Sequence, residues 1–153
     1  MNEVFVWLSK IGTYGLVWLA LGLALSFAWR RWQPFLLVLA ADAVADGVAT
    51  LLKLAFGVHR PAEEGDLLGV PHSRSFPSGH TATSFACATV LALLVPRAAP
   101  FVYVLALAIG YSRLYVGVHW PTDVLGGAVV GVATALLLLA AARRRSMPPR
   151  RRG

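Results

Sequence analysis

The chain has 153 residues, of which 58% are hydrophobic and only 14% are charged. A soluble domain usually carries about 25% charged residues, so this composition excludes an ordinary water-soluble domain and indicates one domain with lipid as its solvent. The net charge of +7 is concentrated in the arginine-rich segment 143–153, which follows an apolar stretch. Such a tail is more typical of a cytoplasmic membrane flank than of a nucleic-acid-binding arm, so we expect no nucleic acid partner.

Five apolar stretches have about the length that a bilayer-spanning helix needs, which is about 20 residues. The second is interrupted by Asp42, Asp46 and Lys53, and the third is short. The sequence therefore predicts an all-α, polytopic membrane helix bundle, with a membrane domain over residues 1–142 and a basic cytoplasmic tail over 143–153. The predicted spans are Ile11–Trp29, Phe35–Phe56, Gly79–Val95, Ala98–Val118 and Val124–Ala142.

The basic residues are divided unevenly between the two ends of these spans. Most of the 14 Lys and Arg residues fall in the joints after the first and third spans and in the tail. The positive-inside rule places this end in the cytoplasm, and therefore places the N-terminus outside. We expect a multi-pass plasma-membrane protein whose extracytoplasmic face carries the polar stretch 57–78 and the turn around His119.

Three polar clusters, far apart in the sequence, fall at that predicted outer face. Ionisable residues at membrane depth are costly and usually functional. Once the spans are threaded through a bilayer, the clusters converge, and this convergence predicts one site. The clusters are Lys53-x6-Arg60-Pro61, Pro77-Ser78-Gly79-His80 and Ser112-Arg113-x5-His119-x3-Asp123.

The cationic and helix-end residues of these clusters suit a phosphoryl group. Lys53, Arg60 and Arg113 supply three positive charges, two of them planar forks that match phosphate oxygens. Ser78 and Gly79 stand at a predicted helix N-terminus, where free backbone N–H groups and the helix dipole favour an anion. No acidic cluster offers ligands for a hard cation, so we expect neither a metal nor another cofactor.

Two histidines and an aspartate supply the predicted chemistry. His119 and Asp123 are four residues apart, so at a helix start the carboxylate reaches one imidazole nitrogen and leaves the other free to attack phosphorus. His80 would protonate the leaving oxygen and then activate water, a form of acid–base help that contributes about 10²–10⁴-fold. The sequence therefore predicts a metal-independent phosphatase with a phosphohistidine intermediate.

The order and spacing of the three clusters resemble the signature of the type 2 phosphatidic acid phosphatase superfamily, which also includes vanadium haloperoxidases. The resemblance covers about half of the chain and implies His119 as nucleophile, Asp123 as its orienting group and His80 as acid. Many membrane members look like six-span proteins with both termini inside, whereas this chain shows five predicted spans. The matching positions are Lys53, Arg60, Pro61, Pro77, Ser78, Gly79, His80, Ser112, Arg113, His119 and Asp123.

The expected substrate is a lipid phosphate whose acyl or prenyl chain stays in the bilayer. Phosphatidate, phosphatidylglycerol phosphate and polyprenyl diphosphates such as undecaprenyl diphosphate all fit, and the sequence does not choose among them. A rival hypothesis is a non-catalytic protein that binds phosphate or lipid headgroups, or a transporter subunit. That rival needs the cationic cradle, but it does not need His119 and Asp123 at helical spacing.

Asp42 and Asp46 lie one turn apart in the second predicted span. We expect a structural polar pair buried between helices. The functional alternatives are a counter-charge for Lys53 or a path for protons.

Gly127 and Gly131 form a small-residue motif in the last predicted span. Close packing within the monomer is the expectation. A homo-oligomer built on the same motif is the alternative.

Overall fold

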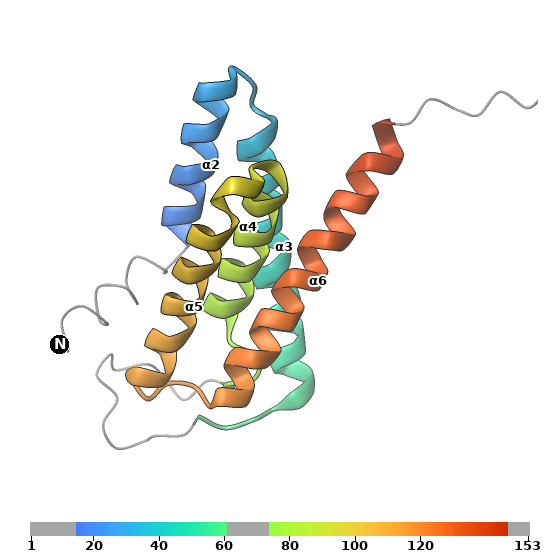
Figure 1. Ribbon diagram of the computed structural model, residues 1–153. Coiled ribbons are helices and arrows are strands. Elements are labelled where there is room, and N and C mark those ends of the chain that lie inside the picture. Colours follow the sequence, from blue (N-terminus) through green and yellow to red (C-terminus); the bar gives the residue numbers. More distant parts are fainter. Residues whose placement is uncertain (1–14, 61–73, 147–153) are drawn as a thin grey trace, which may run out of the picture.

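The computed structural model describes residues 15–60 and 74–146, and within these ranges every regular element is a helix (Figure 1). The all-α prediction is confirmed. The elements are α2 (Leu16–Trp29), α3 (Gln33–Phe56), α4 (Gly79–Leu94), the short 3-10 helix η2 (Pro96–Ala98), α5 (Ala99–Tyr115) and α6 (Pro121–Ser146).

Three stretches are long and apolar enough to cross a bilayer, namely Gln33–Phe56, Pro96–Tyr115 and Pro121–Arg144. The helices α2 and α4 are also apolar but have only 14 and 16 residues. At 1.5 Å per residue they are roughly 21 and 24 Å long, short of the roughly 30 Å hydrocarbon core. The chain is a multi-pass membrane protein, and the start of the first predicted span, residues 11–14, lies outside the described residues.

The boundaries of the last two helices differ from the predicted spans for local reasons. The helix α5 ends at Tyr115, because the chain turns at Gly117 with a φ of 75°. The helix α6 begins at Pro121, a residue suited to a first helical position because it has no N–H to leave unpaired. It continues to Ser146, so the first residues of the predicted tail belong to this helix.

The central helix of the bundle is α4, which packs against α3, α5 and α6. Most of its side chains are buried, and many are small, including Ala82, Ala86 and Ala88. A Cβ added at Gly127 of α6 would lie 2.6 Å from the carbonyl oxygen of Ser78, so glycine allows the two backbones to approach. The expectation that the Gly127 and Gly131 motif packs within the monomer is confirmed.

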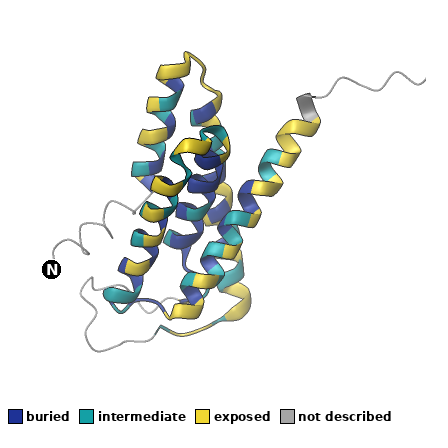
Figure 2. Cartoon of the chain, in the orientation of Figure 1, coloured by how far each residue is buried: buried dark blue, intermediate teal, exposed yellow. Residues whose placement is uncertain are grey.

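Large apolar side chains cover the outside of the bundle, where lipid replaces water (Figure 2). Phe101, Val129 and Leu137 are each at least 70% exposed. This pattern is the reverse of a soluble protein, which rarely exposes contiguous apolar patches of this extent.

One end of the bundle gathers the last turns of α3 and α5 and the first turns of α4 and α6 (Figure 1). The opposite end carries the α2–α3 joint, η2 and the last turns of α6. The described residues of the three polar clusters therefore meet at one end, as predicted, while Pro61 of the first cluster lies outside the described ranges.

Candidate active site

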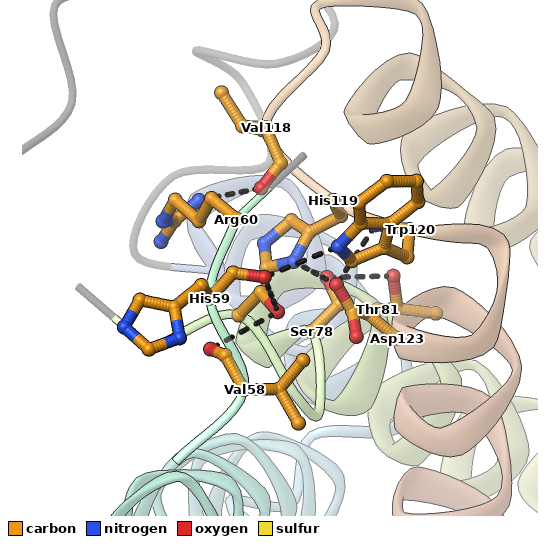
Figure 3. A network of polar contacts seen from close by, with 10 residues as sticks. Val58, His59, Arg60, Ser78, Thr81, Val118, His119, Trp120 and Asp123 are labelled. Carbon is orange, nitrogen blue, oxygen red and sulfur yellow. Dashed lines mark hydrogen bonds and ion pairs between the residues drawn. The ribbon is translucent and has the colours of Figure 1, made fainter. Parts of the chain in front are cut away.

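The start of α6 fixes the predicted histidine and aspartate pair (Figure 3). The Nδ1 atom of His119 lies 3.3 Å from Oδ2 of Asp123, and both side chains are buried. The main-chain N–H of Trp120 donates to the same oxygen at 2.8 Å. Asp123 is the third residue of α6, so it closes the helix start in the manner of a capping box while it holds the imidazole.

The start of α4 lies directly beside this pair. The main-chain N–H of Ser78 donates to the carbonyl oxygen of Asp123 at 2.9 Å. The Ser78 side chain does not cap a main-chain N–H of its own helix, and its hydroxyl instead accepts a hydrogen bond from the Thr81 hydroxyl at 3.0 Å. With no acidic residue in its first turn, α4 presents uncapped N–H groups and a positive dipole end, which together favour an anion.

Lys53, in the last turn of α3, reaches this helix end. A Cβ added at Gly79 would lie 3.6 Å from the Lys53 Nζ and the same distance from Oδ1 of Asp46. That spacing is ordinary van der Waals contact, so crowding by the protein does not demand glycine here. The missing side chain instead keeps the first turn of α4 open to a ligand beside the ammonium group.

The segment after α3 brings Arg60 to the His119 turn. Its Nη1 donates to the carbonyl oxygen of Val118 at 2.8 Å. The preceding residue, His59, accepts hydrogen bonds through its carbonyl oxygen from the indole of Trp120 and the hydroxyl of Ser75. Because the backbone at His59 is bonded to both Trp120 and Ser75, the guanidinium of Arg60 is held beside His119 (Figure 3).

Two further predicted residues, the buried Arg113 and the half-buried His80, carry buried polar atoms that are unpaired. Within the described ranges, Nε and Nη2 of Arg113 and Nε2 of His80 have no hydrogen-bond partner, and neither does Oδ1 of Asp123. Buried polar groups are nearly always paired, so such a concentration calls for an explanation. The charges of Arg113, His119, Lys53 and Arg60 act on His80, so these residues belong to one electrostatic cluster.

Ser112, the last position of the signature, does not join them. Its hydroxyl donates to the carbonyl oxygen of Ile109 in its own helix at 2.6 Å. Its contribution is local to the last turns of α5 and places no polar group in the site.

The two aspartates of α3 do not form the expected buried pair. Asp42 is half-buried beside Gly15, the residue before α2, and the thiol of Cys87, whose Sγ lies 4.0 Å from Oδ1 of Asp42. Asp46 is exposed, so the expectation is wrong for this residue. The reason is positional: Asp46 lies at the level where α4 begins, near Gly79, and no further turn of α4 covers it.

Three supporting residues were not predicted from the sequence. Trp120 and Ser75 hold the segment that carries Arg60, and Arg74 donates to the carbonyl oxygens of Lys53 and Leu54 at the end of α3. Basic side chains commonly satisfy the last carbonyl groups of a helix in this way. Pro121 followed two positions later by Asp123 is a sequence pattern typical of a helix start, and it could have predicted the bond between Asp123 and the N–H of Trp120.

Burial lowers the pKa of the His119 imidazole below its ordinary value of 6.5, and the positive charges of Arg60 and Lys53 act in the same direction. The hydrogen bond to Asp123 opposes this shift but does not outweigh it. The imidazole is therefore neutral near pH 7, the state in which a ring nitrogen carries the lone pair that nucleophilic attack requires.

Comparison with known proteins agrees with this geometry. Residues 16–147 match the PAP2 superfamily. A transmembrane PAP2-type phosphatidylglycerolphosphate phosphatase from Bacillus subtilis superposes with a TM-score of 0.75 and 26% identity, over 98% of this chain and 79% of that one. The chain is 35% identical to decaprenylphosphoryl-5-phosphoribose phosphatase of Mycobacterium tuberculosis, over 81% of this chain and 71% of that protein. It is 39% identical over 94 residues to lipid A 1-phosphatase of Porphyromonas gingivalis, which covers 59% of this chain but only 20% of that protein.

Proposed function

Because the chain belongs to the PAP2 superfamily, we propose that it is an integral-membrane phosphatase that hydrolyses a lipid phosphate or prenyl diphosphate through a phosphohistidine on His119. The observation that carries the proposal is the buried pair of His119 and Asp123, next to the uncapped start of α4. A protein that only binds phosphate has no need of an imidazole whose Nδ1 is fixed and whose Nε2 stays free to react.

The phosphate is held by charge from three helices and one loop. Lys53, Arg60 and Arg113 neutralise the equatorial oxygens, and the hydroxyl of Ser78 and the N–H of Gly79 donate to them. The unpaired buried atoms of Arg113 support this role, since a bound phosphate supplies the acceptors that the described residues lack.

In the first step, Nε2 of His119 attacks phosphorus, an N–P bond forms and the bond to the leaving oxygen breaks. Protonated His80 gives its proton to that oxygen. The Nδ1–H of His119 donates to Asp123, which stabilises the positive ring of the phosphohistidine. In the second step, neutral His80 takes a proton from water, the resulting oxygen attacks phosphorus, and the N–P bond breaks to release inorganic phosphate.

The substrate is a lipid whose chain remains in the bilayer. The relatives above are named for phosphatidylglycerolphosphate, lipid A and a decaprenyl-linked phosphoribose, compounds that share a phosphate on a lipid or prenyl anchor. Because their headgroups differ, we propose for this chain only the shared feature, a phosphate on a lipid or prenyl anchor, and no particular headgroup. The basic residues at the opposite end of the bundle, Arg30, Arg31 and Arg97, support an extracytoplasmic site.

The test compares purified wild type with His119→Ala in detergent containing EDTA. Phosphate release is measured from phosphatidate, phosphatidylglycerol phosphate and a polyprenyl diphosphate. We expect release from at least one lipid by the wild type alone, together with an acid-labile phosphoenzyme that the variant does not form. Equal release by both proteins would contradict His119 as nucleophile, and no release from any lipid by folded wild type would favour a binding protein.

A further inference from the structure

A cavity lies where α2 turns into α3. This turn is at the end of the bundle opposite the candidate active site (Figure 1). The cavity has a volume of about 280 Å³. It contains no residue that the proposed reaction uses, so phosphate hydrolysis does not explain it. The residues that line it are Ser26, Phe27, Arg30, Arg31 and Trp32.

Two aromatic residues, Phe27 and Trp32, line this cavity. The rings of Phe27 and Trp32 lie 6.2 Å apart, and the ring of Trp32 lies 6.4 Å from that of Phe35, edge-on. Phe27 and Trp32 are nonetheless more than 60% exposed. Amphipathic aromatic residues at the ends of membrane helices lie at the level of the lipid headgroups, so the cavity opens at that level.

The backbone at Arg30 is unusual. Among the described residues, Arg30 alone has a positive φ, 53°, without being a glycine. Its N–H donates to the carbonyl oxygen of Phe27, and that of Arg31 donates to the carbonyl oxygen of Ser26, which together close the end of α2. Glycine is the usual residue at this position because it adopts a positive φ without steric cost. The geometry of the turn therefore does not explain why position 30 is an arginine, and we look for the explanation in its side chain.

No acidic residue of the described ranges lies near the positive charges of Arg30 and Arg31. The acidic residues of the described ranges are Asp42, Asp46 and Asp123, and the first of these already lies well inside α3. The start of α3 adds further positive character, because its first turn contains no acidic residue to offset the helix dipole. Ser26 accepts the N–H of Phe35 at 2.9 Å and holds this helix start against α2. Two guanidinium groups at a helix N-terminus favour a phosphate-like anion.

We propose that this cavity binds the phosphate group of an anionic phospholipid in the leaflet opposite the active site. Arg30 and Arg31 bind the phosphate oxygens, and the rings of Phe27 and Trp32 lie against the glycerol and the first methylene groups. A lipid is favoured over a soluble anion because the lining combines two arginines with two exposed aromatic side chains, Phe27 and Trp32, at the membrane surface.

The test measures thermal unfolding in phosphatidylcholine nanodiscs with and without phosphatidylglycerol. The wild type is compared with Arg30→Gly, Arg31→Gln and the matched control Arg97→Gln, which removes an exposed charge from η2 at the same end of the bundle. For Arg30→Gly we expect two changes of opposite sign. The midpoint in phosphatidylcholine alone rises, because glycine relieves the positive φ, while the increase caused by phosphatidylglycerol shrinks.

Titration with phosphatidylglycerol should give an apparent affinity about tenfold weaker for Arg30→Gly and Arg31→Gln than for the wild type and Arg97→Gln. Hydrolysis of a soluble phosphate ester at the wild-type rate checks that each variant is folded. Retention of the full phosphatidylglycerol effect in Arg30→Gly would overturn the proposal, and so would an equal loss in Arg97→Gln, which would indicate general surface charge. An equal, Arg30-dependent increase with millimolar inorganic phosphate alone would overturn the assignment to lipid.

Discussion

The main-chain N–H of Ser78 donates to the carbonyl oxygen of Asp123, and this 2.9 Å bond joins the start of α4 to the start of α6. Through it, the predicted phosphate-binding turn and the predicted nucleophile share one rigid junction. The same Asp123 holds His119 and Trp120 through its side chain. Its backbone and carboxylate therefore position both halves of the site, and the two contributions can be separated by mutation.

Asp123→Asn tests the carboxylate alone. Asparagine keeps an oxygen for the N–H of Trp120 and leaves the backbone bond to Ser78 in place, but it removes the negative charge beside the His119 ring. We expect kcat to fall by about 10³-fold or more with little change in the thermal midpoint, because the imidazole loses both its preferred tautomer and the stabilisation of its positive form. A fall of less than tenfold in steady-state kinetics would contradict this role.

His80→Ala tests the predicted acid through the leaving group. An alkoxide leaving group needs a proton, whereas a nitrophenolate leaves without one. We therefore expect His80→Ala to lose about 10²–10⁴-fold on a lipid phosphate but much less in the formation of phosphoenzyme from nitrophenyl phosphate. His119→Ala is the control and should lose both reactions. Equal losses by His80→Ala on the two substrates would show that this residue does not act as an acid.

The lowered pKa of His119 predicts the direction in which pH changes stability. Because the folded state holds this imidazole neutral below its ordinary pKa of 6.5, the unfolded chain binds more protons as the pH falls. The stabilising contribution is complete above that value and is lost as the pH falls through 6.5 towards the folded-state pKa. Thermal midpoints measured between about pH 8 and pH 5 should therefore fall more steeply for the wild type than for His119→Gln. A steeper fall in the variant would contradict the lowered pKa.

Much of the site could be predicted because its residues occur at fixed distances from helix ends. Lys53, His80, Arg113 and His119 lie within a turn or two of a predicted span boundary, so any bundle of these spans gathers them. Burial within the site could not be predicted in the same way. Asp46 differs from Asp42 only because α4 starts beside it, and a helix start is a property of the packed structure.

The supporting contacts were beyond prediction for a related reason. Trp120, Ser75 and Arg74 donate to backbone carbonyl groups of residues at least 16 positions away, and a carbonyl group has no sequence signature. The predicted helix boundaries were closer to those observed. The helix α5 ends at Tyr115 rather than Val118, and α6 begins at Pro121 rather than Val124, because Gly117 and Pro121 act through ordinary local chemistry.

Two glycine substitutions of equal size should affect stability in opposite directions. A Cβ at Gly131 of α6 would lie 2.9 Å from the backbone nitrogen of Ala86, whereas one at Gly47 of α3 would meet nothing within 4 Å. Gly131→Ala forces α6 away from α4 and should cost about 1–3 kcal/mol. Gly47→Ala should gain up to about 1 kcal/mol from helix propensity. Thermal unfolding in the same detergent compares them, and equal effects would contradict the close packing of α4 and α6.

Asp46→Asn addresses the carboxylate beside Lys53. Asp46 is exposed and, among the described residues, forms no capping contact like that of Asp123, although its Oδ1 and the Lys53 ammonium group both lie near Gly79. Since exposed charge pairs contribute at most about 1 kcal/mol, we expect hydrolysis to change by no more than about fivefold, chiefly in KM, because Lys53 binds phosphate without it. Matched steady-state assays of Asp46→Asn, Lys53→Gln and His119→Ala provide the comparison. If Asp46→Asn lost as much activity as His119→Ala, the carboxylate would belong to the reaction itself, and Lys53 would need Asp46 to reach the phosphate.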